Sequence, residues 1–182
     1  MAKLERERKY RLGEDQVTEL RRRLVAFGEW LSREAEADVF FDHPRIRLGD
    51  NDQRLRVRFH GEDGSRELTF KGARRFDHGD KLRLEVSTAL AGGQIEEILA
   101  QLGFTRVQQF VKLRETYRLG NAIVRIDELD PVGWFCEIEA LADTANLDSV
   151  ATALRLGPAE LEPRSYSELI DEAAAYTSAV SI

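Results

Sequence analysis

The 182-residue chain carries 27 Lys and Arg against 33 Asp and Glu, a net charge of −6, with a hydrophobic content of 42%. This composition indicates a globular protein with a full core, and the acidic balance argues against a nucleic-acid partner. No apolar run reaches the length of a membrane span and the N-terminus is charged from Lys3 onward, so we expect a cytoplasmic protein with no membrane partner. The single Cys136 argues against a disulfide within the chain and against a multi-cysteine metal site.

The opening stretch KLERERKYRL, residues 3–12, has the spacing of an unusual strand. In a strand, alternate side chains share a face, so Glu5, Glu7 and Lys9 lie on one side. Two carboxylates about 6.6 Å apart repel by roughly 2.5 kcal/mol at an effective dielectric constant near 20. We therefore expect either raised pKa values for these acids or a bound cation that neutralises them.

The rest of the chain alternates between helical and strand-like patterns. Val17, Leu20, Leu24 and Phe27 predict a helix that stops at Gly28. Period-two patterns and turn residues then predict strands over 36–42, 53–60, 66–72, 80–87, 110–119, 121–129 and 134–141, with a short helix ending at Gly103 and helices over 146–157 and 165–176. No repeat or linker divides the chain, so we expect a single domain over 1–182. Eight antiparallel strands either stack as two sheets or close into a barrel.

One face of each strand after the first is charged and the other is apolar. The apolar parity includes Leu55, Val57, Leu68, Leu84, Val111, Val124, Ile126, Cys136 and Ile138. The opposite, charged parity holds Arg56, Arg58, Thr69, Lys71, Lys81, Arg83, Glu85, Lys112, Arg114, Arg125, Asp127, Glu137 and Glu139. For any one strand, a charged face in water is the simpler interpretation. Its repetition, with acids in the first and last strands and bases in the middle strands, favours a closed α+β fold: an eight-stranded antiparallel β-barrel with flanking helices.

Closure of the sheet into a barrel would place the five carboxylates of the first and last strands opposite the Arg and Lys side chains of the middle strands. Clustered Asp and Glu oxygens suit Mg²⁺ or Mn²⁺. Arg favours bidentate contacts with phosphate, and Lys acts as a point charge. This pattern predicts a polyphosphate ligand bound together with a divalent metal.

These residues resemble the CYTH family, the triphosphate tunnel metalloenzymes. ERERK matches the family's ExExK signature as Glu5, Glu7 and Lys9, and the arginines of LRVR, the lysine of TFKG, the R-x-E of LRLE, the K-x-R of VKLR, the aspartate of RIDEL and the E-x-E of CEIE follow in the family's order. The ending EPRSYSELI is most similar to the bacterial class IV adenylyl cyclase branch. The resemblance implies the same closed barrel, a tunnel.

The resemblance also implies roles for individual residues. Metal ligands would be Glu5, Glu7, Asp127, Glu137 and Glu139. Triphosphate-binding residues would be Lys9, Arg56, Arg58, Lys71, Arg83, Lys112, Arg114 and Arg164, of which Arg164 would close the tunnel mouth or simply order a loop. Catalytic residues would be Glu5, Glu7, Lys9, Lys112 and Arg114, and Glu85 would orient a neighbouring base.

Three functions remain open from the sequence. The first, which the C-terminal resemblance favours, is an adenylyl cyclase that converts ATP to cyclic AMP and pyrophosphate with Mg²⁺ or Mn²⁺. The alternative is a triphosphatase acting on tripolyphosphate, thiamine triphosphate or nucleotides. A non-catalytic polyphosphate-binding module is the third, but binding alone would not need five carboxylates. The partner in each case is a small triphosphate, and a homodimer is an open alternative to a monomer.

Other candidate groups carry less chemistry. His43, His60 and His78 lack ligand spacing and are interpreted as surface residues, and Cys136 falls on the apolar parity as a packed residue. The chain has neither a GxSxG sequence nor a Walker lysine motif, so nucleophilic serine and P-loop chemistry find no support.

Overall fold

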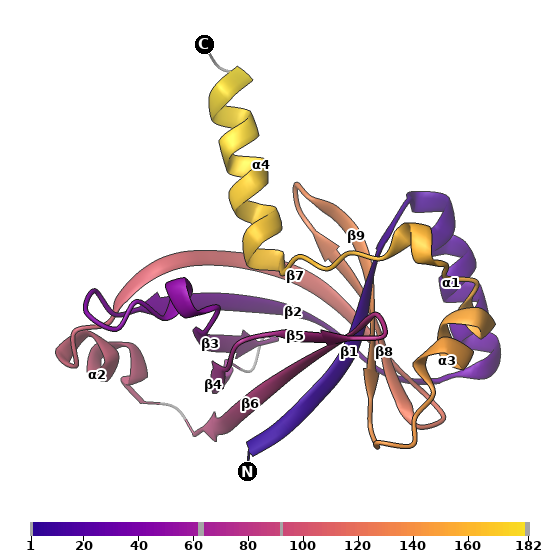
Figure 1. Cartoon of the computed structure of the whole chain (residues 1–182), viewed down its shortest axis with the longest axis horizontal. Coiled ribbons are helices and arrows are strands. Elements are labelled where there is room, and N and C mark those ends of the chain that lie inside the picture. The colour runs from indigo at the N-terminus through magenta and orange to yellow at the C-terminus, as the bar shows by residue number, and fades with distance from the viewer. Residues whose placement is uncertain (1, 62–63, 92, 181–182) are drawn as a thin grey trace. The chain divides into compact units, whose positions relative to one another are not determined.

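The computed structural model describes residues 2–61, 64–91 and 93–180 (Figure 1). Within these residues the strands are β1 (Ala2–Leu12), β2 (Glu29–Asp42), β3 (Arg54–His60), β4 (Ser65–Lys71), β5 (Arg75–Asp77), β6 (Asp80–Leu90), β7 (Thr105–Leu119), β8 (Ala122–Leu129) and β9 (Gly133–Ala140). The α-helices are α1 (Glu14–Phe27), α2 (Ile95–Gln101), α3 (Leu147–Leu154) and α4 (Tyr166–Val180), and short 3₁₀ turns cover Leu48–Asn51 and Pro158–Glu160. In the part of the chain that the structure describes, no helix combines the length and hydropathy that a membrane span requires.

The strands form one sheet in the order β1-β9-β8-β7-β2-β3-β4-β6-β5, and an additional β1–β6 pairing closes this order. The three-residue β5 pairs with β6 and lies outside the closed ring of eight long strands. The pairs with a described register are antiparallel. The predicted α+β fold, a closed eight-stranded antiparallel barrel with helices, is therefore confirmed.

Two strands begin earlier than the alternation predicts. β2 starts at Glu29, directly after Gly28, and its first three residues are exposed, so they show no alternation of apolar and polar side chains. β7 starts at Thr105 through three exposed residues for the same reason. The hairpin predicted between β3 and β4 is present, with His60 opposite Ser65, and residues 62–63 of its turn lie outside the described residues.

The chain divides into two compact units, each with its own apolar cluster. Unit 1 comprises residues 1–6 and 34–111, and unit 2 comprises residues 7–33 and 112–182. β1, β2 and β7 contribute residues to both units. The cluster of unit 1 includes the buried residues Val39, Phe41, Val57 and Leu99, so α2 covers β2 and β3 there.

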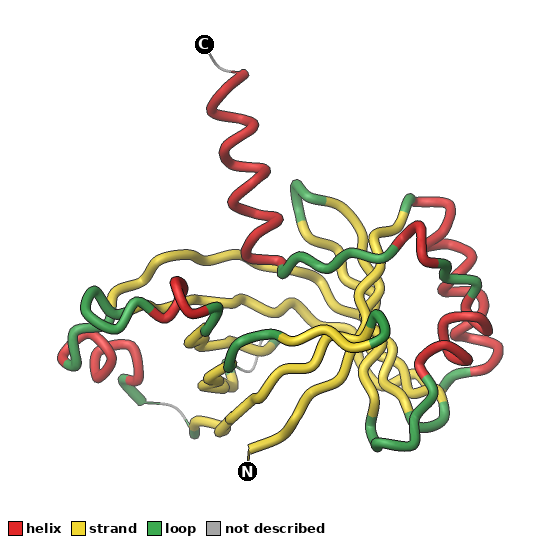
Figure 2. The backbone as a smooth tube through the Cα atoms, viewed as in Figure 1, coloured by secondary structure: helices red, strands yellow, loops and turns green. Residues whose placement is uncertain are grey.

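The cluster of unit 2 is larger and holds α1 in place. Val17, Leu20 and Leu24 bury one face of α1 in a cluster that also contains residues of β8, β9 and α3, and α1 and α3 lie side by side (Figure 2). The helix ends at Gly28, where an added Cβ would lie 3.0 Å from the Leu24 carbonyl oxygen and 3.3 Å from that of Arg118. A glycine stop is therefore required by close backbone approach.

Many charged side chains of this protein are buried, although charged side chains are usually exposed. The buried members of the charged parity are Arg56, Arg58, Thr69, Arg83, Lys112, Arg114, Asp127, Glu137 and Glu139, together with Glu7 and Lys9 of β1. On β6, by contrast, the apolar Leu84 and Val86 are 45% and 43% exposed. The strands therefore place a charged interior where an ordinary sheet would place an apolar one. Cys136 is fully buried, as its parity predicts.

Candidate functional site

In unit 1, Lys71 joins two carboxylates. Lys71 on β4 lies directly opposite Glu85 on β6, and its ammonium contacts the Glu85 carboxylate while lying 3.7 Å from Glu5 Oε2. Burial raises the pKa of the Glu5 carboxyl, the Lys71 ammonium opposes this shift, and a hydrogen bond with Glu85 raises the pKa further. At Glu85, burial also raises the pKa, but the Lys71 ammonium and the hydrogen bond with Glu5 outweigh it, so the pKa of the Glu85 carboxyl is lowered. Glu5 and Glu85 thus have pKa values shifted in opposite directions, so of the two carboxyls Glu5 is the one that binds a proton more readily.

A second acid–base group of unit 1 surrounds the two arginines of β3. Arg58 donates hydrogen bonds of 2.6 and 2.8 Å to the two carboxylate oxygens of Asp38, and its Nη1 lies 2.8 Å from Glu36. Arg56 Nη2 donates to Glu67 and Thr69 at 3.4 and 3.3 Å. Glu36 and Asp38 are two positions apart on β2, so their side chains share one face of the strand. This spacing was the sequence signal for the two carboxylates that pair with Arg58, and neither was among the predicted site residues.

Besides Glu36 Oε2, which lies 2.8 Å from Arg58 Nη1, two buried polar atoms of unit 1 make no hydrogen bond within the described residues. They are the Glu5 Oε2 carboxylate oxygen and the Arg56 Nε–H group. A buried polar atom left without a hydrogen bond costs roughly 1–3 kcal/mol, and more when the group is charged. One of these atoms suits a cation and the other suits an anion.

Arg83 forms hydrogen bonds with the backbone of unit 1. It is 4% exposed and donates to the carbonyl oxygens of Gly72 and Asp52 at 2.5 and 2.7 Å. Burial lowers the pKa of this guanidinium, although Asp52 opposes the shift. The predicted phosphate contact of Arg83 stays a prediction.

Glu34, Glu36 and His60 form a group that sequence reasoning missed. Their ligand atoms all lie within 4.8 Å of one another, a spacing that could hold a metal ion, in a search confined to the described residues. His60 lies opposite Glu36 in the β2–β3 register, so pairing across the sheet brings an isolated histidine beside two acids. His60 Nδ1 is 3.7 Å from Glu34 and 3.9 Å from Glu36, which a histidine–glutamate ion pair also explains.

In unit 2, the buried Arg114 pairs with two carboxylates of the charged interior. Arg114 Nε and Nη2 donate to the two oxygens of Asp127 at 2.6 and 2.5 Å, and Nη2 also donates to Glu137 at 2.6 Å. Arg114 and Asp127 are directly opposite in the β7–β8 register, which fixes this bidentate pair. Two of the predicted metal ligands, Asp127 and Glu137, are thus brought together on one guanidinium.

Glu7 and Glu139, a second pair of predicted metal ligands, lie opposite each other in the β1–β9 register. Both are buried, at 5% and 6% exposure, and like charges at opposite positions destabilise a sheet. Arg125 Nη1 donates to Glu139 at 2.7 Å and offsets part of this repulsion. Lys112, another predicted site residue, is 1% exposed on β7.

Lys9 and the segment before α4 meet in unit 2. Lys9 Nζ donates to the Arg164 carbonyl oxygen at 2.8 Å and lies 3.8 Å from Glu137 Oε1. The Arg164 side chain is bound by Glu162 and by Glu172, the latter at 2.6 Å, and is 42% exposed. Its predicted contact with a phosphate would have to compete with these two carboxylates.

Tyr166 was not among the predicted site residues. Its hydroxyl donates to Asp127 Oδ2 at 2.6 Å, and its ring lies 4.0 Å below the Lys9 ammonium. Burial and then the Asp127 and Glu137 carboxylates raise the pKa of Tyr166 well above its ordinary value, so the hydroxyl stays protonated and donates. The only signal in the sequence was its place in the RSYSEL stretch.

The charged interior and the closed strand order have a counterpart among known proteins. The model of the CYTH domain matches residues 3–166. The chain belongs to the CYTH family. The CYTH domain thus spans nearly the whole chain, from the first predicted metal-ligand strand to the first residue of α4.

Individual relatives support the same family. "Adenylate cyclase CyaB" of Aeromonas hydrophila is 28% identical over 145 residues, which cover 75% of this chain and 73% of that protein. The solved structure of PH1819 from Pyrococcus horikoshii is 28% identical, with a TM-score of 0.79 over 93% of this chain and 99% of its own. HpAC1 of Hippeastrum, described as having a dominant triphosphatase activity, shares the fold at 17% identity, with a TM-score of 0.72 over 93% of this chain and 96% of its own.

Proposed function

We propose that this CYTH protein is a divalent-metal-dependent enzyme acting on triphosphates, and that its reaction is the conversion of ATP to cyclic AMP and pyrophosphate. The observation that carries the proposal is the pair of buried atoms in unit 1, Glu5 Oε2 and Arg56 Nε, that make no hydrogen bond among the described residues. A metal–triphosphate complex supplies both a cation and an anion. The 28% identity to the Aeromonas hydrophila protein named as an adenylate cyclase supports the choice of reaction.

The carboxylates proposed to hold the metal are Glu5, Glu7, Asp127, Glu137 and Glu139. The donor set fits a hard cation, since it consists of carboxylate oxygens and one of them, Glu5 Oε2, is buried without a hydrogen bond. When bound, Mg²⁺ or Mn²⁺ would supply Lewis-acid polarisation and lower the pKa of a coordinated hydroxyl group.

The cations proposed to bind the triphosphate lie on several strands: Lys9, Arg56, Arg58, Lys71, Arg83, Lys112 and Arg114. Their role is to hold the phosphates in line for attack and to offset the negative charge that develops on the leaving group. In the cyclase reaction the ribose 3′-oxygen forms a bond to the α-phosphorus as the bond to pyrophosphate breaks, and the hydroxyl proton passes to water. Lys112 and Arg114 stabilise the departing pyrophosphate.

Triphosphate hydrolysis is the second candidate function. HpAC1 has the same fold and is described by a triphosphatase activity, which supports the alternative at the level of the fold. Both reactions use the same three phosphates, so affinity does not separate them. The attacked atom differs: the α-phosphorus in the cyclase and the terminal phosphorus in the triphosphatase.

Product analysis separates the two reactions. We expect ATP with Mn²⁺ or Mg²⁺ to yield cyclic AMP and pyrophosphate in equal amounts, with turnover abolished by EDTA. Orthophosphate from tripolyphosphate, with no cyclic nucleotide from ATP or GTP, would replace the cyclase assignment by the triphosphatase. Loss of neither ATP nor tripolyphosphate in the presence of either metal would contradict both assignments.

A pair of arginine substitutions tests whether Arg56 contributes to triphosphate binding. Arg56→Ala removes a buried guanidinium and should raise KM for the triphosphate by the loss of a charge-assisted contact worth roughly 1.5–3 kcal/mol. Arg22→Ala is the matched control, because Arg22 lies on α1, is 68% exposed and pairs only with Glu19 among the contacts described. An equal KM in both variants would remove Arg56 from the proposed site.

A further inference from the structure

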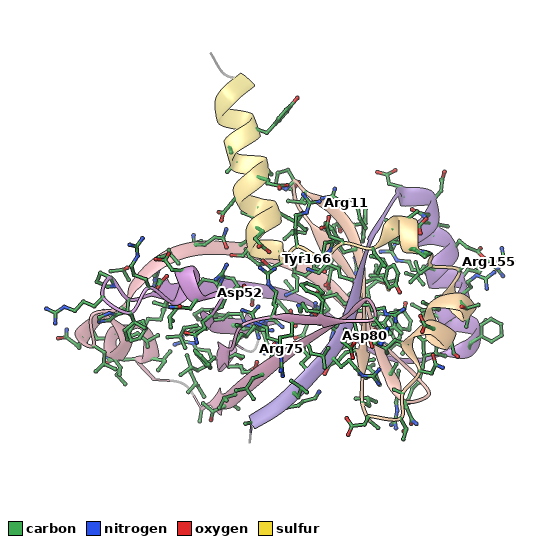
Figure 3. All side chains as sticks on the ribbon, viewed as in Figure 1. Arg11, Asp52, Arg75, Asp80, Arg155 and Tyr166 are labelled. Carbon is green, nitrogen blue, oxygen red and sulfur yellow. The ribbon has the colours of Figure 1, made fainter. Side chains whose placement is uncertain are left out.

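Tyr166 is the first residue of α4 (Figure 3), and the side chains of Ser165 and Glu168 cap the helix at this end. Ser165 N–H donates to Glu168 Oε2 at 2.7 Å, and Glu168 N–H donates back to Ser165 Oγ at 3.3 Å, a reciprocal capping arrangement. Leu169, three residues later, is 2% exposed and anchors the first turn of the helix. The Tyr166 side chain, itself 8% exposed, is therefore held in one position within unit 2.

The hydroxyl of Tyr166 completes the hydrogen bonding of a buried carboxylate. Asp127 has no exposed surface, and its two oxygens accept two hydrogen bonds from Arg114 and one of 2.6 Å from Tyr166. A carboxylate offers about four acceptor positions, so Tyr166 supplies one of the donors that fix the carboxylate plane. Because the Arg114 fork binds that plane in a bidentate manner, the same hydrogen bond fixes the direction of the guanidinium.

The ring of Tyr166 supports a second cation. The Lys9 ammonium lies 4.0 Å from the ring centroid, within the range of a cation–π interaction. The ring also packs against that of Phe135 in a T-shaped arrangement, with centroids 5.2 Å apart and planes at 66°. One side chain thus touches Lys9 through its face and Arg114 through Asp127.

We infer that Tyr166 is a positioning residue for Lys9 and Arg114, two of the cations that bind the triphosphate, and that it couples the start of α4 to the site. The expected effect on catalysis rests on the proposed function. Most phosphate contacts of these cations exist already in the bound substrate, and only the part of the Arg114 contact that strengthens on the departing pyrophosphate is specific to the transition state. Loss of their positioning therefore raises KM more than it lowers kcat.

Two tyrosine substitutions form a matched pair. Tyr166→Phe removes only the hydroxyl and keeps the ring under Lys9. Tyr117→Phe removes a hydroxyl that likewise donates to a buried carboxylate of unit 2, Glu115, at 3.4 Å. Strand alternation puts Glu115 and Tyr117 on the face of β7 opposite to Arg114. Both variants should keep the fold, so a purely structural role would affect the two similarly.

The kinetic readout is the split between KM and kcat for ATP and for tripolyphosphate with Mn²⁺. We expect Tyr166→Phe to raise KM about tenfold with kcat changed less than about threefold, and Tyr117→Phe to leave both within about twofold. Tyr166→Leu also removes the ring and should therefore raise KM further than Tyr166→Phe does. The difference in KM between these two variants measures the contribution of the ring beneath Lys9. An unchanged KM in Tyr166→Phe would overturn the inference.

Side-chain NMR tests the positioning without any turnover. The Arg114 Nε–H signal, assigned by its loss in Arg114→Lys, should be protected from exchange in the unsubstituted protein. We expect Tyr166→Phe to lose this protection and Tyr117→Phe to retain it. Equal protection in both variants overturns the inference even if ATP is turned over. If no triphosphate is turned over, the proposed function fails while this signal still decides the role of Tyr166.

Discussion

Glu5 and Glu137 share a predicted role as metal ligands but have different surroundings. Burial raises the pKa of Glu5, and its Oε2 accepts no hydrogen bond within the described residues. Glu137 accepts a 2.6 Å hydrogen bond from Arg114 and lies 3.8 Å from Lys9. The structure therefore distinguishes two carboxylates to which the family resemblance assigned the same role.

Neutral substitutions at these two positions should have different effects on the metal-free protein. We expect Glu5→Gln to leave the melting temperature in EDTA unchanged or raised, since burial disfavours the charge that this substitution removes, as the raised pKa of the Glu5 carboxyl shows. Glu137→Gln should lower stability by roughly 1.5–3 kcal/mol, because it removes the charge that pairs with buried cations. Urea unfolding in EDTA measures both, and a large loss in Glu5→Gln would make Glu5 a structural ion-pair partner.

Asp42 provides a test of pH dependence away from the predicted metal ligands. Burial opposes ionisation of this group, but the N–H groups of Gly49, His43 and Leu48 outweigh it and lower the pKa of the carboxyl. Because the pKa in the folded state is depressed, the stabilisation is present above the unfolded value of about 3.9 and is lost as pH falls through the folded value.

We therefore expect Asp42→Asn to be less stable than the unsubstituted protein at pH 6, with the difference shrinking below about pH 3. Urea unfolding at the two pH values provides the measurement. Asp77→Asn is the control, since Asp77 has a side chain that is 71% exposed. A stability difference that stays constant between the two pH values would show that Asp42 acts by packing and not by its charge.

At the scale of elements, α1 stabilises unit 2 through one narrow face. Leu24 has no exposed surface, whereas the adjacent Val25 is 76% exposed. Leu24→Ala should cost roughly 2–5 kcal/mol, because truncation leaves a cavity in the largest apolar cluster. Val25→Ala should change stability by less than about 0.5 kcal/mol. Urea unfolding followed by the fluorescence of Trp30 and Trp134, both in unit 2, measures the two variants, and similar values would contradict the proposed packing.

At the scale of the whole molecule, the single domain over 1–182 stays a prediction. Three strands, β1, β2 and β7, contribute residues to both compact units. Melting one unit alone would fray strands of the other, so we propose that the chain unfolds in one cooperative transition. Val57→Ala in unit 1 and Leu24→Ala in unit 2 should each lower the same midpoint for hydrogen-exchange probes in both units. Separate midpoints would identify two domains.

The eight long strands and the charged parity could be predicted from the sequence because both depend on a local period of two, whereas the three-residue β5 is too short to show a period. Arg56, Arg58, Lys112 and Arg114 are buried as the alternation indicated. The exposed beginnings of β2 and β7 escaped prediction because their residues face solvent and carry no alternating pattern.

The partners of these residues were decided only by the tertiary structure. Register places Arg114 against Asp127 and His60 against Glu36, and no local pattern encodes which residue lies opposite another. The raised pKa of Glu5 depends on burial and on Lys71 and Glu85, which are distant in sequence. Tyr166 reaches Asp127 across 39 positions of the chain. The sequence by itself determined which side chains carry charge on which face; long-range pairing determined which of them are neutralised, because Coulomb energy and hydrogen bonding depend on separation in space.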